Sequence, residues 1–387
     1  MSPVENRVDA SPVEAEKRTG FIELFFDLVF VFAFTQVAAL LVEDASAGGF
    51  GRAALVFALI WWAWSAYAWL TNAIDVENLG TRLFVFAAML ATFFMALAVP
   101  DAFTDEGAWF AVGYFVVRVL QIALYLWGVR NDPVQRLAVA RLAPWFLVAP
   151  SVALAGGFVD DPARTTLWTA SLAIDVVGTL IAARSGFRVS PSHFAERYAL
   201  IVIIALGESI VAIGLAAVEL ERDGVFALAV GVSFAGAAAA WWAYFDISQL
   251  AAERRLRDAP EEVRGPLARD VYTFFHYPLV LGIIFLAVAA KKTVGAPTEP
   301  LSDGGRAALA LGLTLFLLGF VLSRYRVIRR IAWERIGAAA AVVAIVLLLD
   351  DADALLLLAL AVVALVTALA IERFRLSGLR SAPSGPH

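Results

Sequence analysis

Long apolar segments recur along the whole chain and constrain its fold more than any other feature. Each covers about 18–24 residues, which is enough for an α-helix to cross the roughly 30 Å hydrocarbon core of a membrane. Hydrophobic residues make up 61% of the 387 residues and charged ones only 17%, whereas an average soluble domain is about 25% charged. The sequence therefore predicts an all-α polytopic membrane protein, with the lipid bilayer as its main partner.

Twelve such segments can be delimited, and a tight acidic turn around Asp350 separates the last two. The longest connection, 248–269, has room for at most one surface helix, so no soluble domain is expected. The predicted transmembrane helices are 20–42, 51–71, 82–99, 107–128, 137–157, 165–183, 197–219, 224–247, 270–290, 304–323, 335–349 and 353–371.

The charges predict which way the chain crosses the membrane. Residues 1–19 are hydrophilic and lack the apolar core of a signal peptide, and residues 376–387 are expected to form a disordered tail. Most of the 30 Arg and Lys residues fall in the termini and the even-numbered loops, if Arg141, Arg197 and Arg335 are counted there as helix ends. The positive-inside rule then predicts a bacterial cytoplasmic membrane protein with both termini in the cytoplasm.

Motifs in the first half of the chain recur in the second half. Asp27 precedes the Trp61–Trp62 pair by 34 residues, and Glu208 precedes the Trp241–Trp242 pair by 33. Further along, "RLAVAR" is answered by "RIAWER", and the segment that starts "DDPART" by the one that starts "DDADAL".

This order predicts two parallel six-helix repeats, 20–190 and 191–375. An even number of spans per half gives both halves the same direction, so an axis along the membrane normal would relate them. That relation places the first helix opposite the seventh and Asp27 opposite Glu208.

Ionisable residues inside the apolar segments are the candidate functional residues. Glu23 and Asp27 are four residues apart and share one helix face, while Asp175 and Glu208 lie deeper, with Arg118 as a basic group at comparable depth. A charge at the bilayer centre costs at least about 2.5–3.5 kcal/mol. Because the acids outnumber Arg118, the surplus acids are expected to be protonated or to lie in a wet cavity, as a proton-coupled pathway requires.

Each candidate also has a structural interpretation. A protonated acid can hold two helices together by a hydrogen bond, and Arg118 with Asp175 can form a static clamp. His276 is interpreted as a partly buried, hydrogen-bonded histidine rather than a metal ligand. Ser209, beside Glu208, completes the set of candidate proton- or substrate-binding residues. No catalytic residue, metal site or cofactor is predicted, and cysteine is absent, which excludes thiolate chemistry.

Two motifs resemble those of a known family. "ELFFDLVFVFAFTQVA" (23–38) and "ERYALIVIIALGESIVAIG" (196–214), with "WWAW" and "WWAY", resemble the bacterial low temperature requirement A (LtrA) family over residues 20 to 375. The resemblance implies a multi-span membrane protein, and the family's name describes a phenotype. The positions that match the family's motifs and are polar here are Glu23, Asp27, Glu196, Arg197, Glu208 and Ser209.

Three functions stay open at this point. The first is a proton-linked secondary transporter of a small solute, with no nucleic-acid partner, in which Asp27 and Glu208 bind protons and Arg118 is the counter-charge. The second is an intramembrane lipid-modifying enzyme that uses Glu23 and Asp27 as acid–base groups or cation ligands. The third is a non-transporting membrane protein of stress or cold adaptation. A wide polar cavity between the halves would favour the first, a lateral opening beside clustered acids the second, and a dry interface the third.

Overall fold

The computed structural model describes residues 18–182, 189–218 and 220–380, which form helices joined by short connections. In chain order the helices are α1 (Phe21–Glu43), α2 (Ala47–Ala73), α3 (Leu79–Leu97), α4 (Gly107–Gly128), α5 (Pro133–Gly157), α6 (Ala163–Ala182), α7 (Pro191–Ala217), α8 (Gly224–Ala243), η1 (Tyr244–Ser248), α9 (Gln249–Arg257), α10 (Glu261–Ala268), η2 (Arg269–Phe274), α11 (His276–Gly295), α12 (Asp303–Ile328), α13 (Trp333–Leu348) and α14 (Ala354–Arg380). The elements η1 and η2 are π-helices.

Several helices begin at side chains that cap their first backbone N–H groups. Ser46 accepts a hydrogen bond from the third residue of α2, and Asp223 does the same for α8. Asp132 caps α5 just before a proline at its first position. These polar residues therefore fix the helix starts between the apolar segments.

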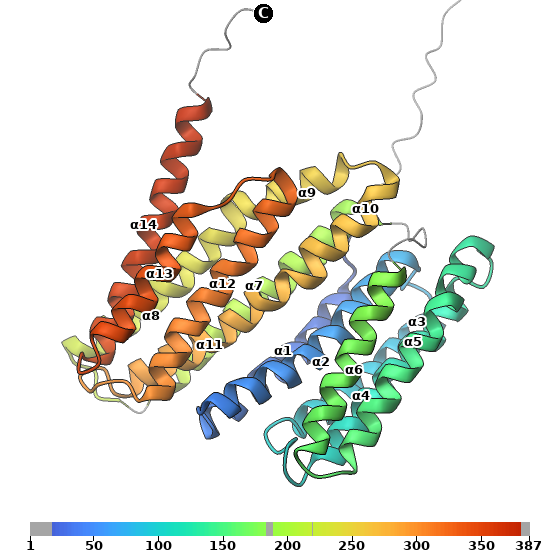
Figure 1. The fold of residues 1–387 in the computed structure, drawn as a ribbon, viewed down its shortest axis with the longest axis horizontal. Coiled ribbons are helices and arrows are strands. Elements are labelled where there is room, and N and C mark those ends of the chain that lie inside the picture. Colours follow the sequence, from blue (N-terminus) through green and yellow to red (C-terminus); the bar gives the residue numbers. More distant parts are fainter. Residues whose placement is uncertain (1–17, 183–188, 219, 381–387) are drawn as a thin grey trace, which may run out of the picture.

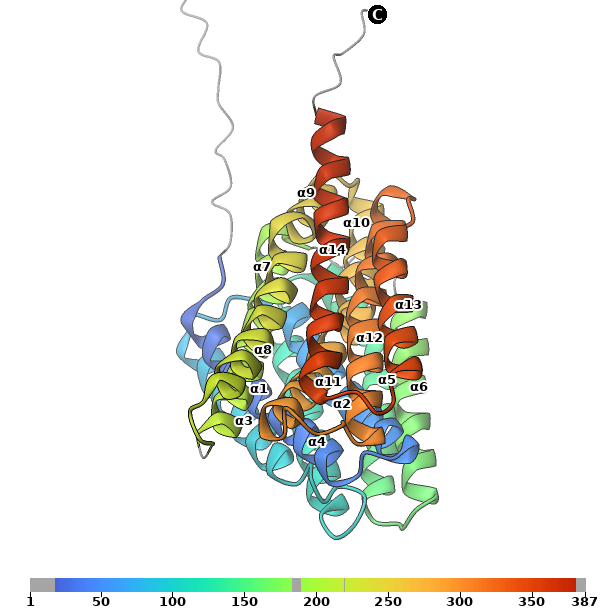
Figure 2. The same ribbon diagram turned by 90° about the vertical axis from the view of Figure 1, so that its left-hand side faces the viewer.

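The helices form two bundles that lie side by side (Figure 1). One contains α1–α6 and the other α7–α14, and the view turned by 90° shows that the axes of most long helices are roughly aligned (Figure 2). The bundles meet where α1 and α2 pack against α7 and α11. Two helices from the first half of the chain and two from the second half thus build one shared interface.

Ten segments of the described chain are long and apolar enough to cross a membrane. Helices α6 and α13 are not among them: α13 has only 16 residues, and α6 carries Arg164, Asp175 and several hydroxyl residues. The multi-pass architecture is confirmed, whereas twelve spans in two repeats are not.

Two connections differ from the prediction. The segment 248–269 holds two helices, α9 and α10, and the π-helices η1 and η2 join them directly to α8 and α11. Helix α14 continues to Arg380, five residues into the segment expected to be a tail. Residues 1–17 and 381–387 lie outside the described residues. The tight hairpin between α13 and α14 is confirmed.

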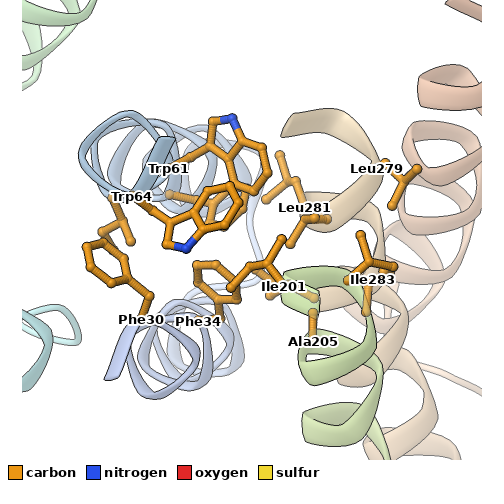
Figure 3. Packing of buried hydrophobic residues seen from close by; sticks show 14 of the residues in the cluster. Phe30, Phe34, Trp61, Trp64, Ile201, Ala205, Leu279, Leu281 and Ile283 are labelled. Atoms are coloured by element: carbon orange, nitrogen blue, oxygen red, sulfur yellow. The ribbon is translucent and has the colours of Figure 1, made fainter. Parts of the chain in front are cut away.

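Aromatic side chains fill the contact between the bundles (Figure 3). Trp61 and Trp64 of α2 are 1% and 0% exposed, and they lie near Phe34 of α1 and Ile201 of α7. The Trp64 ring also meets Tyr198 edge-on, with 4.8 Å between ring centroids. Buried aromatic rings contribute large apolar areas, so these side chains join the two bundles through an extensive apolar contact.

Candidate functional site

The two acids predicted on α1 lie buried against α7. Asp27 Oδ1 accepts hydrogen bonds from Arg197 Nη2 and from Trp64 Nε1, each at 2.8 Å. Both carboxylate oxygens of Glu23 lie 3.1 Å from His193 Nε2, and Glu23 Oε1 is 3.5 Å from Arg197 Nη1. These four ionisable side chains, Glu23, Asp27, His193 and Arg197, are called the charge cluster below. All four are at most 2% exposed.

The two contacts of the charge cluster have the same register. Glu23 with His193 and Asp27 with Arg197 are each separated by 170 residues in sequence. Within each helix the two residues are four apart and share a face. A constant separation is the pattern of parallel helices, so α1 and α7 run in the same direction where they meet.

Several polar atoms of the charge cluster are buried without a hydrogen-bond partner among the described residues. They include Asp27 Oδ2, His193 Nδ1 and Arg197 Nε, and such atoms are uncommon in folded proteins. A cavity of about 10 Å³ lies beside Glu23 and Arg197, near the minimum size for a single water. The site therefore has unused hydrogen-bonding capacity in a nearly solvent-free place.

Three hydroxyl groups form a second group next to the first. Ser65 Oγ is 2.8 Å from Tyr198 Oη and donates to Thr273 Oγ1 at 3.1 Å. Tyr198 Oη is also 3.1 Å from Thr273 Oγ1, which accepts a hydrogen bond from Trp69 Nε1 at 3.0 Å. We call Ser65, Tyr198 and Thr273 the hydroxyl cluster. It joins α2 of the first bundle to α7 and η2 of the second.

Residues of the hydroxyl cluster are adjacent in sequence to residues of the charge cluster, or to a side chain that it binds, on two helices. Ser65 follows Trp64 on α2, and Tyr198 follows Arg197 on α7. A shift of Arg197 relative to Asp27 would therefore move Tyr198 relative to Ser65.

The π-helix η2 exposes carbonyl groups that side chains satisfy. Thr273 O accepts a hydrogen bond from Trp61 Nε1 at 2.8 Å, and Val271 O lies 2.9 Å from His276 Nδ1. His276 Nε2 lies 2.9 Å from the Tyr244 hydroxyl, so both ring nitrogens have a polar partner. His276 is hydrogen-bonded, as predicted, and more deeply buried than the partial burial expected, at 4% exposed. π-Helical turns are frequent at functional sites.

A cavity of about 100 Å³ opens beside the hydroxyl cluster, between α2, α4, α5 and α6 of the first bundle and α10 and η2 of the second. We call it the interface cavity. It is lined by Trp62, Ser65, Ala66, Trp69, Gln121, Ile122, Tyr125, Val139, Ala143, Phe146, Thr179, Gly265, Arg269 and Thr273.

A larger cavity of about 400 Å³ lies on the outer face of α7. Its lining includes Arg18, Glu196, Phe245 and Glu253, so it is more polar than the interface cavity. Glu196 Oε2 also accepts a hydrogen bond from the Thr19 backbone at 3.0 Å. Helix α7 therefore separates a polar cavity from the buried charge cluster.

Arg118 and Asp175 form a pair of their own inside the first bundle. Arg118 donates two hydrogen bonds to Asp175, at 2.7 and 2.9 Å, and a third to Tyr114 Oη at 3.0 Å. Both charged side chains are fully buried. The pair ties α4 to α6 and does not touch the charge cluster, which agrees with the clamp interpretation.

The predicted pairing of Asp27 with Glu208 is wrong. Asp27 lies against Arg197, and Glu208 is 11 residues farther along α7, about 16 Å at 1.5 Å per residue. Glu208 is half-buried and forms no ion pair with any described residue. Ser209 Oγ donates to Ala205 O at 3.3 Å and lines a separate cavity of about 60 Å³.

The predicted excess of buried acids over buried bases was too large, because Arg118 was taken as the main buried base. Arg197 was assigned to a helix end, yet it is fully buried between both α1 acids. His193, which contacts Glu23, was not among the candidates either. The signal was present in the sequence, because the four-residue spacing of Glu23 and Asp27 is repeated by His193 and Arg197 with complementary chemistry.

Comparison with known proteins identifies the family. The family model described as "Bacterial low temperature requirement A protein (LtrA)" matches residues 18–370. The chain belongs to the LtrA family. It is also similar to a curated protein of Rhizobium meliloti (strain 1021), described as the uncharacterized protein RA0937, with 33% identity over 318 residues that cover 79% of this chain and 76% of the relative. No solved structure matches the chain. The charge cluster lies wholly within the part of the chain that the LtrA model matches.

Proposed function

We propose that this LtrA-family protein is a proton-linked secondary transporter or permease rather than an enzyme. Proton binding at the charge cluster would be coupled to the movement of a small solute between the two bundles. The observation that carries this proposal is the burial of Glu23, Asp27, His193 and Arg197 at the contact of the bundles.

The charge balance of the cluster supports proton binding. Two carboxylates face one permanently charged guanidinium and one histidine. With both acids ionised and His193 neutral, the cluster has a net charge of −1. One added proton, on His193 or on a carboxylate, makes it neutral. Because an unbalanced charge in a low-dielectric site is costly, gain or loss of that proton changes how strongly α1 holds α7.

The arrangement of the helices supports a two-half transporter. In the first bundle α1 packs on α3, α3 on α4, α4 on α5 and α5 on α6, and in the second bundle α7, α11, α12, α13 and α14 contact one another in the same order. Many transporters place their sites at the interface of two repeats.

The proposal includes a location in the bacterial cytoplasmic membrane, with both ends of the chain in the cytoplasm. The charge cluster lies near the starts of α1 and α7, so it and the polar cavity lined by Glu196 would then lie toward the cytoplasmic side.

A second function has one observation in its favour. The contact between α1 and α7 is tightly packed around Trp61 and Trp64, as expected of a non-transporting membrane protein of stress or cold adaptation. An intramembrane enzyme has less support, because Glu23 and Asp27 are both engaged by basic side chains.

The test uses purified full-length protein in liposomes that contain a pH-sensitive dye. Amino acids, monosaccharides, polyols and short monocarboxylates are added outside, one class at a time. We expect at least one class to move protons in wild-type vesicles, and Asp27→Asn to abolish that movement while exposed Asp44→Asn leaves it unchanged. Absence of proton movement with every class in wild-type vesicles, or equal movement in Asp27→Asn vesicles, overturns the proposal.

A further inference from the structure

The wall of the interface cavity is mostly apolar and holds one buried polar atom without a partner among the described residues. Gln121 is 4% exposed, lines the cavity, and its Oε1 accepts no hydrogen bond from any described residue. A buried acceptor of this kind is normally satisfied by the protein or by a bound molecule. The cavity therefore offers one hydrogen-bond acceptor to an occupant.

The rest of the lining favours aromatic contact. Four rings, those of Trp62, Trp69, Tyr125 and Phe146, contribute to the wall. Aromatic rings pack against one another in edge-to-face or offset arrangements. The volume of about 100 Å³ is of the same order as the engineered apolar cavity of about 150 Å³ that binds benzene. One six-membered ring is the size of occupant that fits.

The electrostatics of the lining favour a neutral occupant. None of the described residues that line the cavity carries a carboxylate, and Arg269 of the wall donates to Asp270 Oδ1 at 2.9 Å. Asp270 also accepts from Arg326 at 2.8 Å, so Arg269 is held in an ion-pair network. The hydroxyls of Ser65 and Thr273 are engaged within the hydroxyl cluster.

We propose that the interface cavity binds a neutral hydroxylated aromatic ring, of the phenol class, which donates a hydrogen bond to Gln121 Oε1. It deepens the proposed function by naming the class of solute, or of the buried end of a solute, that the transporter would bind. Binding can be measured at equilibrium and does not require transport.

The experiment compares 4-fluorophenol with fluorobenzene by ¹⁹F NMR, using full-length protein in lipid nanodiscs and empty nanodiscs as background. The two probes share the ring, and 4-fluorophenol adds the donor. We expect wild-type protein to prefer 4-fluorophenol by about tenfold in Kd, the worth of one hydrogen bond. Gln121→Leu should reduce this preference to near unity by weakening 4-fluorophenol alone.

The matched control is Gln135→Leu. Gln135 is also a buried glutamine whose Oε1 has no partner among the described residues, but it does not line the cavity. This variant should keep the wild-type preference, and the near-isosteric Gln121→Met should behave as Gln121→Leu if the latter unfolds. An unchanged preference in both Gln121 variants, or no binding above empty nanodiscs, overturns the inference.

Asp27→Asn separates this inference from the proposed function. It should bind 4-fluorophenol as the wild type does while losing proton movement. Binding of 4-fluorophenol without any transport would contradict the proposed transporter function and support the ligand site. Transport without binding of 4-fluorophenol would contradict the ligand site alone.

Discussion

Asp27 and Arg197 are 170 residues apart in the chain, and their side chains meet at 2.8 Å with no exposed surface. The contact joins the first helix of one bundle to the first helix of the other. The sequence predicted that Asp27 lies within the membrane, whereas the positive-inside rule placed Arg197 at a helix end near the membrane surface. The strength of this pair bears directly on how the two bundles are held together.

Removing the base should therefore destabilise the fold strongly. Arg197→Met leaves Glu23 and Asp27 buried without their cation, and breaking a buried ion pair on one side costs about 3–5 kcal/mol. We expect a clear loss of unfolding free energy in detergent, measured by denaturant titration. Arg197→Met combined with Asp27→Leu should recover much of the loss, and a double-mutant cycle measures the coupling.

The exposed pair of Arg52 with Asp44 provides the control. Its side chains are 44% and 38% exposed, and exposed ion pairs contribute little. Arg52→Met should leave the unfolding curve unchanged. Equal losses for Arg197→Met and Arg52→Met would contradict the importance of the buried contact.

Glu208→Gln should behave differently from substitutions in the charge cluster. Because Glu208 has no ion-pair partner among the described residues and lies about three helical turns from Arg197, neutralising it removes a poorly compensated charge from an apolar helix. We expect an unfolding free energy equal to or above that of the wild type, and unchanged proton movement. A loss of stability as large as that of Arg197→Met would show that Glu208 has a partner in the folded protein.

The contrast between these two acids shows what the sequence can predict. The all-helical, multi-pass architecture followed from the apolar segments although the number of spans did not, and the depth of Asp27 and Asp175 marked them correctly as buried. The partners did not follow, because apolar helices carry little information about their relative register. The predicted register of α7 against α1 differs by about three helical turns from the observed one, so Arg197 and not Glu208 lies opposite Asp27.

Charge counting had a separate weakness. It treats an arginine near a helix end as solvated, yet Arg197 and Arg335 are 0% and 2% exposed. Their partners come from other helices, Asp27 of α1 for Arg197 and Glu372 of α14 for Arg335. The interface cavity could not be predicted from the sequence either, because residues of five helices and a π-helix line it.

The pair of Arg118 with Asp175 is expected to act as a clamp without a part in coupling. Asp175→Leu alone should destabilise the protein by about 3–5 kcal/mol, since it leaves Arg118 buried and unpaired. Arg118→Met with Asp175→Leu should restore near wild-type stability, because apolar residues often replace a buried ion pair without loss. Proton movement in liposomes should persist in the double variant. Its loss, in a protein of wild-type stability, would place the pair in the transport pathway.

Close packing of α11 on α12 depends on a glycine. A Cβ at Gly282 would lie 2.5 Å from both Gly312 O and Phe316 N, which are backbone atoms that cannot rotate away. Small residues permit this kind of helix approach in membranes. Gly282→Ala should destabilise the protein by about 1–3 kcal/mol, in line with other overpacked cores, as measured by denaturant titration.

Gly207 is the matched position. It lies within α7, and a Cβ there meets nothing within 4 Å. Gly207→Ala should be neutral or slightly stabilising, because alanine favours helix over glycine by up to about 1 kcal/mol. If both substitutions had the same effect, the close approach at Gly282 would not be what matters.

The hydroxyl of Thr273 is expected to matter more than an ordinary buried hydroxyl. It accepts hydrogen bonds from Ser65 and Trp69 of α2 and lies beside Tyr198 of α7, so Thr273→Val removes these buried hydrogen bonds between helices. Each lost hydrogen bond costs about 0.5–1.5 kcal/mol. Thr293 is also fully buried, and the partner of its hydroxyl among the described residues is Ala289 O within its own helix. Thr293→Val should therefore have a small effect, while Thr273→Val should lower stability by several times as much and weaken 4-fluorophenol binding by loosening the cavity wall. Equal effects of the two substitutions would mean that the hydroxyl cluster does not hold η2 against α2 and α7.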